Sequence, residues 1–349
     1  MSQYLVLSHV KVQNANSIAG FTWGFPAITQ FLGLTHALNR KFSSKCKGSY
    51  QSELSGCAVI ANHADNKVYQ PKPFGDFEFL QSKNPPVLAR HKNTSPPIIE
   101  EGKVNLTVSL VIELSESLVL TTEQATELEH YIGGLCRSMR MAGGTVLDIA
   151  KVKLLSASTE EQKADLLTKI KRLTMPGFVL KDRHEYLKQH SEALIAHAEA
   201  GLVNPLLDAW LDFSALKYTA QAELSDKQTE PDETTNANWK YQAKPFPGFL
   251  VPLMTGYKAI SEVYGPGQVG NLRDQQIPAR FVESVHSIGE WLSMHRVADI
   301  KEFIWRYYQD GDWYLCQQKT LSTADSELCS DILATQSQAE INQQILNLF

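Results

Sequence analysis

The sequence predicts an α+β protein whose first half alternates strands and helices. A long run at 104–114 alternates apolar and polar residues, so that Val104, Leu106 and Val108 share one face of a strand. The stretch after Pro26 instead repeats apolar residues at helical spacing. With 349 residues, 43% of them hydrophobic and 20% charged, the chain can bury a large core and has the composition of a globular protein.

The first strand and the first helix are predicted from the opening 42 residues. Residues 4–12 alternate and are enriched in leucine and β-branched side chains, which is typical of a strand. Pro26 suits the first turn of a helix, where its missing N–H costs no hydrogen bond. The helix then continues to about Phe42, with apolar residues at Phe31, Leu34, Ala37 and Leu38.

Three further elements complete the first half of the chain around the alternating run described above. Residues 56–63 predict a second strand, which is buried. Residues 121–141 predict a second helix, with Thr121 or Thr122 as its N-cap and acidic residues in its first turns. The sequence Ala-Gly-Gly ends this helix, and residues 145–155 predict a further strand.

The resulting order is β-α-β-β-α-β over residues 1–155. This is the ferredoxin-like order, which RNA-recognition modules share with many enzymes. We therefore expect a ferredoxin-like (RRM-like) palm, and this fold does not by itself identify a function.

An insertion at 64–103 separates the second and third predicted strands. It is too long for a tight hairpin, and it is rich in proline and in basic residues. It could be a loose excursion, or it could be a protruding, thumb-like finger that grips a partner, since long insertions in compact domains are often functional.

The second half of the chain divides by composition. Residues 156–221 predict an added helical region, whose basic patch is usually explained by a solvated helix face. Residues 222–240 are acidic and nearly free of apolar side chains, which predicts a linker or long loop. Residues 241–320 return to strand-like sequence around a glycine-rich loop, and 321–349 predict a polar tail.

Composition and motifs exclude several classes of protein. The net charge of −5 gives no indication of a non-specific polyanion binder, although a local basic groove remains compatible with it. The five cysteines are scattered without CxxC spacing, so we expect neither a metal site nor a disulfide framework. No signal peptide or membrane span is evident, and we expect a cytoplasmic protein with no membrane partner.

No signature of an enzyme or of a cofactor site is found in the sequence. Nucleotide-binding glycine motifs, HExxH and GxSxG are all missing. His36, on the first predicted helix, could be a general base, but a helix histidine without a catalytic role is the more common explanation.

An amide-rich and aromatic segment lies between the first strand and the first helix. Its side chains could hydrogen-bond base edges and stack bases. The alternative is a structured turn capped by Asn14 and Asn16, with Trp23 in the core. The candidate residues are Gln13, Asn14, Asn16, Trp23 and Phe25.

Two further stretches are suited to binding phosphate. The glycine-rich loop within 256–284 carries Lys258, Arg273 and Arg280, whose cationic groups fit phosphate oxygens. Gly143 and Gly144 form a turn that can present backbone N–H groups to an anion. Internal salt bridges are the alternative for both arginines, for instance Arg280 with Glu283.

Several long blocks resemble a known family. They include "VQNANSIAGFTWGFPAITQFLGLTHALNRK", "MRMAGGTVL" and "GYKAISEVYGPGQVGNLRDQQIPARFVESVHSIGEWLSMHRVADI". They resemble the Cas-five-family subunit, the second Csy protein, of the type I-F CRISPR surveillance complex. The matching blocks occur in the same order along the chain, from about residue 4 to residue 310. Arg40, Arg140 and Asn271 lie within these blocks and complete the candidate RNA-binding residues.

The resemblance implies a non-catalytic subunit that holds the 5′ handle of the CRISPR RNA. It implies two protein partners, the large Csy subunit and the first subunit of the helical backbone, and proximity to target DNA. The insertion at 64–103 matches the family little, so its assignment as the thumb depends on topology. The alternative function is a ribonuclease that processes repeat RNA, because relatives in other CRISPR types cut RNA on this fold; a third is a protein adaptor that binds no RNA.

Overall fold

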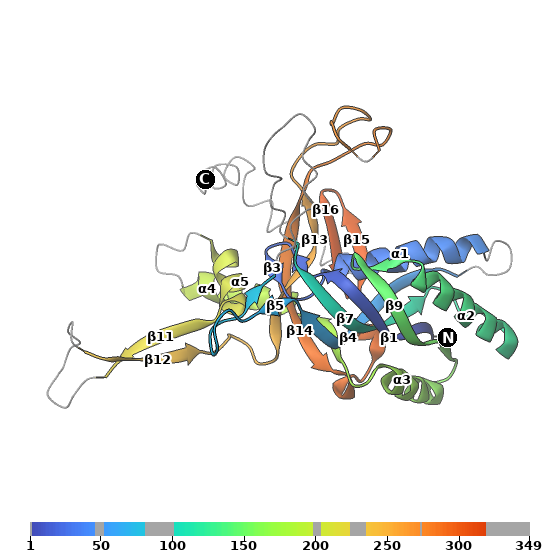
Figure 1. Cartoon of the computed structure of the whole chain (residues 1–349), viewed down its shortest axis with the longest axis horizontal. Helices are drawn as coiled ribbons and strands as arrows, with labels where there is room; N and C mark the ends of the chain where they lie inside the picture. Colours follow the sequence, from blue (N-terminus) through green and yellow to red (C-terminus); the bar gives the residue numbers. More distant parts are fainter. Residues whose placement is uncertain are drawn as a thin grey trace.

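The described part of the chain forms one ten-stranded antiparallel sheet (Figure 1). The computed structural model describes residues 2–45, 52–80, 101–197, 204–223, 235–272 and 274–318. No helix within these residues is long and apolar enough to cross a membrane. The order across the sheet is β15 (Arg306–Asp310), β16 (Trp313–Gln317), β13 (Leu250–Ala259), β14 (Val282–Ser293), β10 (Phe178–Asp182), β4 (Leu54–Asn66), β7 (Lys103–Leu114), β1 (Ser2–Asn16), β9 (Gly144–Ala157) and β8 (Arg140–Met141).

The four strands and two helices expected in the first half are all present. Across the sheet these strands lie in the order β4, β7, β1, β9. Numbered by their place in the chain, this is the order second, third, first, fourth. The helices that connect them are α1 (Ile28–Lys45), between β1 and β4, and α2 (Thr122–Arg137), between β7 and β9. Both helices contribute to one hydrophobic core on the same face of the sheet.

The centre of the sheet is buried on both faces because β1 carries apolar residues at consecutive positions. Leu5 and Leu7 join the core beneath α1 and α2. Tyr4 and Val6 point to the other face, where α3 (Glu160–Thr174) adds Leu166 and Ile170 among others. A strand buried on both sides reads as a continuous apolar run, which is what "YLVL" shows.

Two expected helix boundaries are corrected. Pro26 lies outside α1, which begins at Ile28. Thr121 is the N-cap of α2 and forms a capping box with Gln124, but the helix ends at Arg137 rather than at residue 141. Residues 140–141 instead form β8, which pairs with the start of β9.

The expectation of a helical region over 156–221 is wrong at two places. Between α3 and α4 (His184–His197) the chain forms β10, which pairs with β4 and β14 and so joins the two halves of the sheet. Val179 and Leu180 of β10 are both fully buried, so its sequence has no alternation that would distinguish a strand from a helix. After α5 (Pro205–Ser214) the chain forms another strand, β11 (Lys217–Ala222).

The expected acidic linker at 222–240 is also partly wrong. Residues 224–234 lie outside the described residues, but the segments that flank them are strands. β12 (Ala237–Gln242) pairs with β11 in an antiparallel hairpin, with Tyr218 opposite Tyr241. This hairpin extends away from the body of the molecule (Figure 1).

The strand-rich return at 241–320 is present and extends the same sheet. Trp305, fully buried, fixes it to the first half: its backbone exchanges two hydrogen bonds with Cys57 of β4, and its indole Nε1 donates to the Leu180 carbonyl oxygen at 3.1 Å. The predicted tail at 321–349 lies outside the described residues.

Two short hairpins lie beside the ends of β1 and β4. β2 (Ile18–Ala19) and β3 (Thr22–Trp23) follow β1, and β5 (Val68–Tyr69) and β6 (Glu78–Phe79) follow β4. The second of these belongs to the insertion at 64–103, of which residues 81–100 lie outside the described part of the chain. Whether the insertion protrudes as a thumb therefore stays a prediction.

Candidate nucleic-acid interface

The end of β1 is a turn closed by its own amides. Asn14 has a left-handed backbone (φ 56°), and its backbone N–H donates to the Asn105 Oδ1 atom at 3.2 Å. The Asn16 side chain donates to the Ile18 carbonyl oxygen and accepts from the Ile18 N–H, at 3.0 and 3.1 Å. The Asn16 amide thus caps the turn, whereas Gln13 is exposed on β1.

The predicted glycine turn packs directly against this end of β1. A Cβ atom on Gly144 would lie 2.7 Å from the Gln13 carbonyl oxygen, so the two backbones approach closely only because no side chain is present. The Asn16 N–H donates to the Ala142 carbonyl oxygen at 2.8 Å. Gly143 has φ 76°, and the Arg140 guanidinium donates to its carbonyl oxygen at 3.2 Å. The structure therefore brings Gln13, Asn14, Asn16, Arg140, Gly143 and Gly144 into one cluster.

A lysine with an unneutralised charge lies at this cluster. The Lys67 ammonium donates to the Asn14 Oδ1 atom, and the Lys67 N–H donates to the Lys103 carbonyl oxygen at 3.0 Å. The Asn14 amide is neutral, and the Lys67 ammonium group has no ion pair with a side chain in the described part of the chain. Lys103 itself is paired with Glu101 at 3.3 Å. Lys67 is one of the basic residues of the insertion at 64–103, and no local pattern in the sequence relates it to Asn14.

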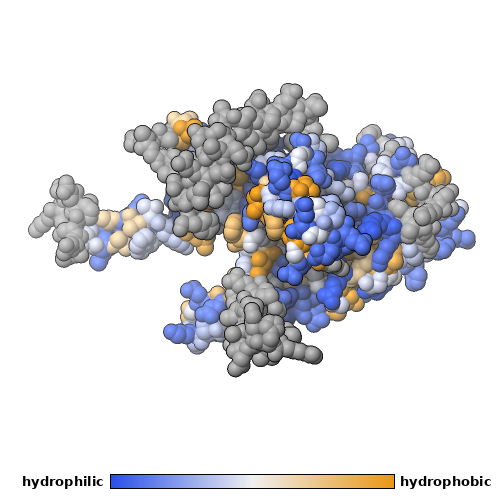
Figure 2. All heavy atoms as spheres, turned by 90° about the horizontal axis from the view of Figure 1, so that it is seen from above, coloured by the Kyte–Doolittle hydropathy of each residue, from blue (hydrophilic) through white to orange (hydrophobic). Residues whose placement is uncertain are grey.

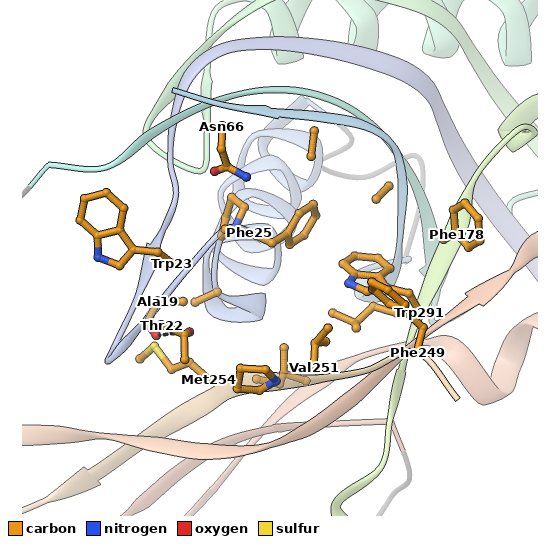
Figure 3. Close-up of a pocket in the computed structure, with 18 residues that line it drawn as sticks. Ala19, Thr22, Trp23, Phe25, Asn66, Phe178, Phe249, Val251, Met254 and Trp291 are labelled. Atoms are coloured by element: carbon orange, nitrogen blue, oxygen red, sulfur yellow. Dashed lines mark hydrogen bonds between the residues drawn. The ribbon is translucent and has the colours of Figure 1, made fainter. Parts of the chain in front are cut away.

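Trp23 and Phe25 line a pocket with a volume of about 660 Å³ (Figure 3). The ring centroid of Trp23 lies 4.5 Å from that of Phe79, and the Phe25 ring meets Trp291 edge to face at 4.8 Å. None of the 18 lining residues carries a charged side chain. They are Ala19, Thr22, Trp23, Gly24, Phe25, Pro26, Ala27, Ala61, Ala64, Asn66, Phe178, Leu180, Phe249, Val251, Pro252, Leu253, Met254 and Trp291.

The other predicted residues form a second group or stand apart. Lys258 lies over the Trp313 ring, 4.8 Å from its centroid, and Asn271 is exposed with φ 60°. Arg280 is bound internally: its Nε donates to the Ser261 carbonyl oxygen at 2.7 Å, and its Nη2 pairs with Asp312. The internal partner is thus Asp312 and not Glu283. Arg40 is exposed on α1, and Arg273 lies outside the described residues.

The three described thiols and His36 differ in burial. Burial raises the pKa of the Cys57, Cys136 and Cys316 thiols to about 12 each, which keeps them protonated and poorly nucleophilic. His36 is exposed on α1, with its ring 6.0 Å from that of Tyr307. No group of three potential metal ligands is found in the described part of the chain. The ribonuclease alternative stays a prediction.

These features define an α/β protein with a large antiparallel sheet and an amide- and aromatic-rich surface where β1 ends. A family model described as "CRISPR-associated protein (Cas_Csy2)" matches residues 5–316. The chain is also 33% identical over 317 residues to the CRISPR-associated protein Csy2 of Pseudomonas aeruginosa (strain UCBPP-PA14), covering 88% of this chain and 92% of that protein. The chain belongs to the Csy2 family of CRISPR-associated proteins, which confirms the resemblance seen in its sequence.

Proposed function

We propose that this Csy2-family protein is a non-catalytic subunit of a type I-F CRISPR surveillance complex and binds the 5′ handle of the CRISPR RNA. In this proposal it acts in the cytoplasm, pairs with the large Csy subunit, adjoins the first backbone subunit and lies close to target DNA. Family membership supports the first part, and the surface at the end of β1 supports the second.

The position of Lys67 is the main observation that supports RNA binding. The Lys67 ammonium group is bonded to the neutral Asn14 amide at the end of β1 and has no ion pair with a described residue, and the preceding residue, Asn66, lines the aromatic pocket. Single-stranded RNA presents phosphates to cations, and splayed bases to amides and aromatic rings. The three kinds of group needed are therefore adjacent on one surface.

The sheet order supports a ferredoxin-like palm as the scaffold for this surface. In that fold the four strands of a β-α-β-β-α-β unit lie in the order second, third, first, fourth, as β4, β7, β1 and β9 do here. The insertion between β4 and β7 then leaves the palm where a thumb would, next to Lys67.

The hairpin of β11 and β12 supports the pairing with protein partners. One of its faces carries Tyr218, Trp239 and Tyr241, which are 56%, 69% and 50% exposed. A two-stranded hairpin is at best marginally stable alone in water. An aromatic face of this kind is typical of an interface that another subunit covers.

Binding of labelled RNA tests the proposal. The protein, copurified with its large partner subunit, is titrated against RNA carrying the repeat-derived 5′ handle and against a permuted sequence of the same composition. We expect tighter binding of the handle, and an affinity that falls with salt by about 0.7 in log–log slope per phosphate contact. Equal affinity for the two RNAs would contradict the proposal, and cleavage of the handle that is lost in His36→Ala would establish the ribonuclease instead.

A further inference from the structure

The pocket beside Trp23 lies where the two halves of the sheet meet. Its walls come from the turn that leads into α1, from β4 and from β10, β13 and β14 (Figure 3). Figure 2 shows that apolar residues also gather on the surface in the middle of the molecule. The volume of about 660 Å³ falls within the range of about 300–1,000 Å³ that is common for small-molecule sites.

Five of the 18 residues that line the pocket are aromatic. Phe25 and Trp291 are partly buried and pack against the core, and their edge-to-face contact fixes both rings. Phe178 and Phe249 are 54% and 69% exposed, so they stand at the rim. A planar ring that entered the pocket would find π-faces both inside it and at its edge.

One polar atom of the pocket has no partner. The Asn66 side chain projects from the end of β4 into the pocket (Figure 3). Its Oδ1 atom is buried and accepts no hydrogen bond from any described residue. A buried amide oxygen without a donor is unfavourable, so a ligand that brings an N–H group would be favoured over a purely apolar one.

The residue after Asn66 in the chain carries a positive charge. Lys67 follows Asn66 directly, and its ammonium group is bonded to the neutral Asn14 amide. An occupant that combines a planar ring, an N–H donor and an anionic link would satisfy the rings, Asn66 and Lys67 together. An aliphatic or aromatic protein side chain would satisfy the rings alone.

We propose that the pocket takes one unstacked nucleobase of single-stranded RNA. The base lies against the rings of Phe25 and Trp291, its exocyclic amino group donates to the Asn66 Oδ1 atom, and its 5′ or 3′ phosphate pairs with Lys67. This inference rests on the proposed RNA-binding function and adds to it the place where a base, rather than the phosphate backbone, is read.

The test uses the copurified complex and a series of handle RNAs, each with one abasic position. We expect a single position at which loss of the base weakens binding about 10-fold, as removal of one stacked base does. At that position, an analogue without the exocyclic amino group should also weaken binding to the wild type, but should not weaken it further in Asn66→Ala.

Two variants keep this test independent of folding. Phe249→Ala removes an exposed rim ring and should weaken binding of intact RNA, with no added effect on the RNA that is abasic at the sensitive position. Tyr308→Ala, an exposed aromatic residue on the edge strand β15, is the matched control and should bind every RNA as the wild type does.

The possible failures are distinguishable. If the wild type does not prefer the handle over a permuted RNA, the proposed function itself fails, and this inference with it. If it prefers the handle but no abasic position couples to Phe249 or Asn66, the base pocket is wrong and the function stands. If Phe249→Ala instead loses the partner subunit with RNA affinity unchanged, the pocket binds a protein side chain and the inference is overturned.

Discussion

His286 on β14 ties the turn after β1 to the second half of the molecule. Its ring stacks on Phe21 at 5.2 Å between centroids and meets Trp210 edge to face at 5.6 Å. Its Nε2 atom lies 3.2 Å from the Ser284 hydroxyl, and its Nδ1 atom is buried without a partner among the described residues. These neighbours are uncharged, and burial lowers the pKa of His286 below its ordinary value of 6.5.

The lowered pKa predicts that acid destabilises the fold. Below about pH 6.5 the unfolded chain binds a proton that the folded chain resists, so the free energy of unfolding decreases as the pH falls from 6.5 through the folded pKa. We expect the melting temperature measured between pH 8 and pH 5 to drop less in His286→Gln than in the wild type. His36→Gln, at an exposed position on α1, is the control and should keep the wild-type profile; identical profiles for all three proteins would show that His286 does not contribute.

Arg280 illustrates how the structure changes the expectation for a predicted phosphate contact. Its guanidinium already bonds the Ser261 carbonyl oxygen and Asp312, and it is 28% exposed. A partly exposed pair of this kind contributes about 1 kcal/mol, which for a protein of this size is a melting-temperature change of about 2 °C. We expect Arg280→Ala to lower the melting temperature by about that amount and to leave the salt slope of RNA binding unaltered.

Arg40→Ala is the companion variant, because Arg40 is exposed on α1 and has no ion pair with a described residue. Its melting temperature should equal that of the wild type. A flatter salt slope in Arg280→Ala, with an unchanged melting temperature, would show that Arg280 leaves Asp312 to bind phosphate.

Among the elements, the β11–β12 hairpin has the clearest division of faces. Residues on one face are aromatic or alanine, and those on the other are polar, because side chains alternate along each strand. The base of the hairpin is anchored by Asp212 of α5, whose carboxylate pairs with Lys217 and lies 2.6 Å from the His190 ring. The hairpin is thus fixed at one end and exposes its aromatic face beyond it.

We expect Trp239→Ser to weaken association with the partner subunits about 10-fold, since buried tryptophans are frequent hot spots of interfaces. The body of the protein should melt at the wild-type temperature, because this residue does not belong to the hydrophobic cores. Lys240→Ser, the next residue on the opposite face, is the control. Equal partner affinity for both variants, measured by surface plasmon resonance, would exclude the aromatic face as an interface.

The elements also show what the sequence could and could not predict. Alternation found β7, enrichment in leucine and β-branched side chains indicated β1, and a capping signal found α2, because all three depend on neighbouring residues. β10 was missed because burial on both faces removes alternation, and β12 because its alternating residues directly follow an acidic segment whose composition predicts a linker. Pocket residues Asn66 and Trp291 come from distant parts of the chain, so no local pattern relates them, whereas Trp23 and Phe25 were found because they adjoin the amide-rich turn.

At the scale of the whole molecule, one sheet joins a β-α-β-β-α-β half to a strand-rich half through β10. The candidate interface lies at this junction, since its pocket takes walls from both halves. We propose that this junction holds the handle of a guide RNA within a larger assembly, and therefore binds a specific RNA end rather than RNA in general.

The most direct test is to coexpress the protein with its partner subunits and a CRISPR array, to purify it by a tag on this chain, and to sequence the RNA that accompanies it. We expect one population of short RNAs with a single, fixed 5′ end derived from the repeat, and a loss of that population in Lys67→Glu while the partner subunits are retained. Copurification without RNA, or with RNAs of random 5′ ends, would contradict the proposal.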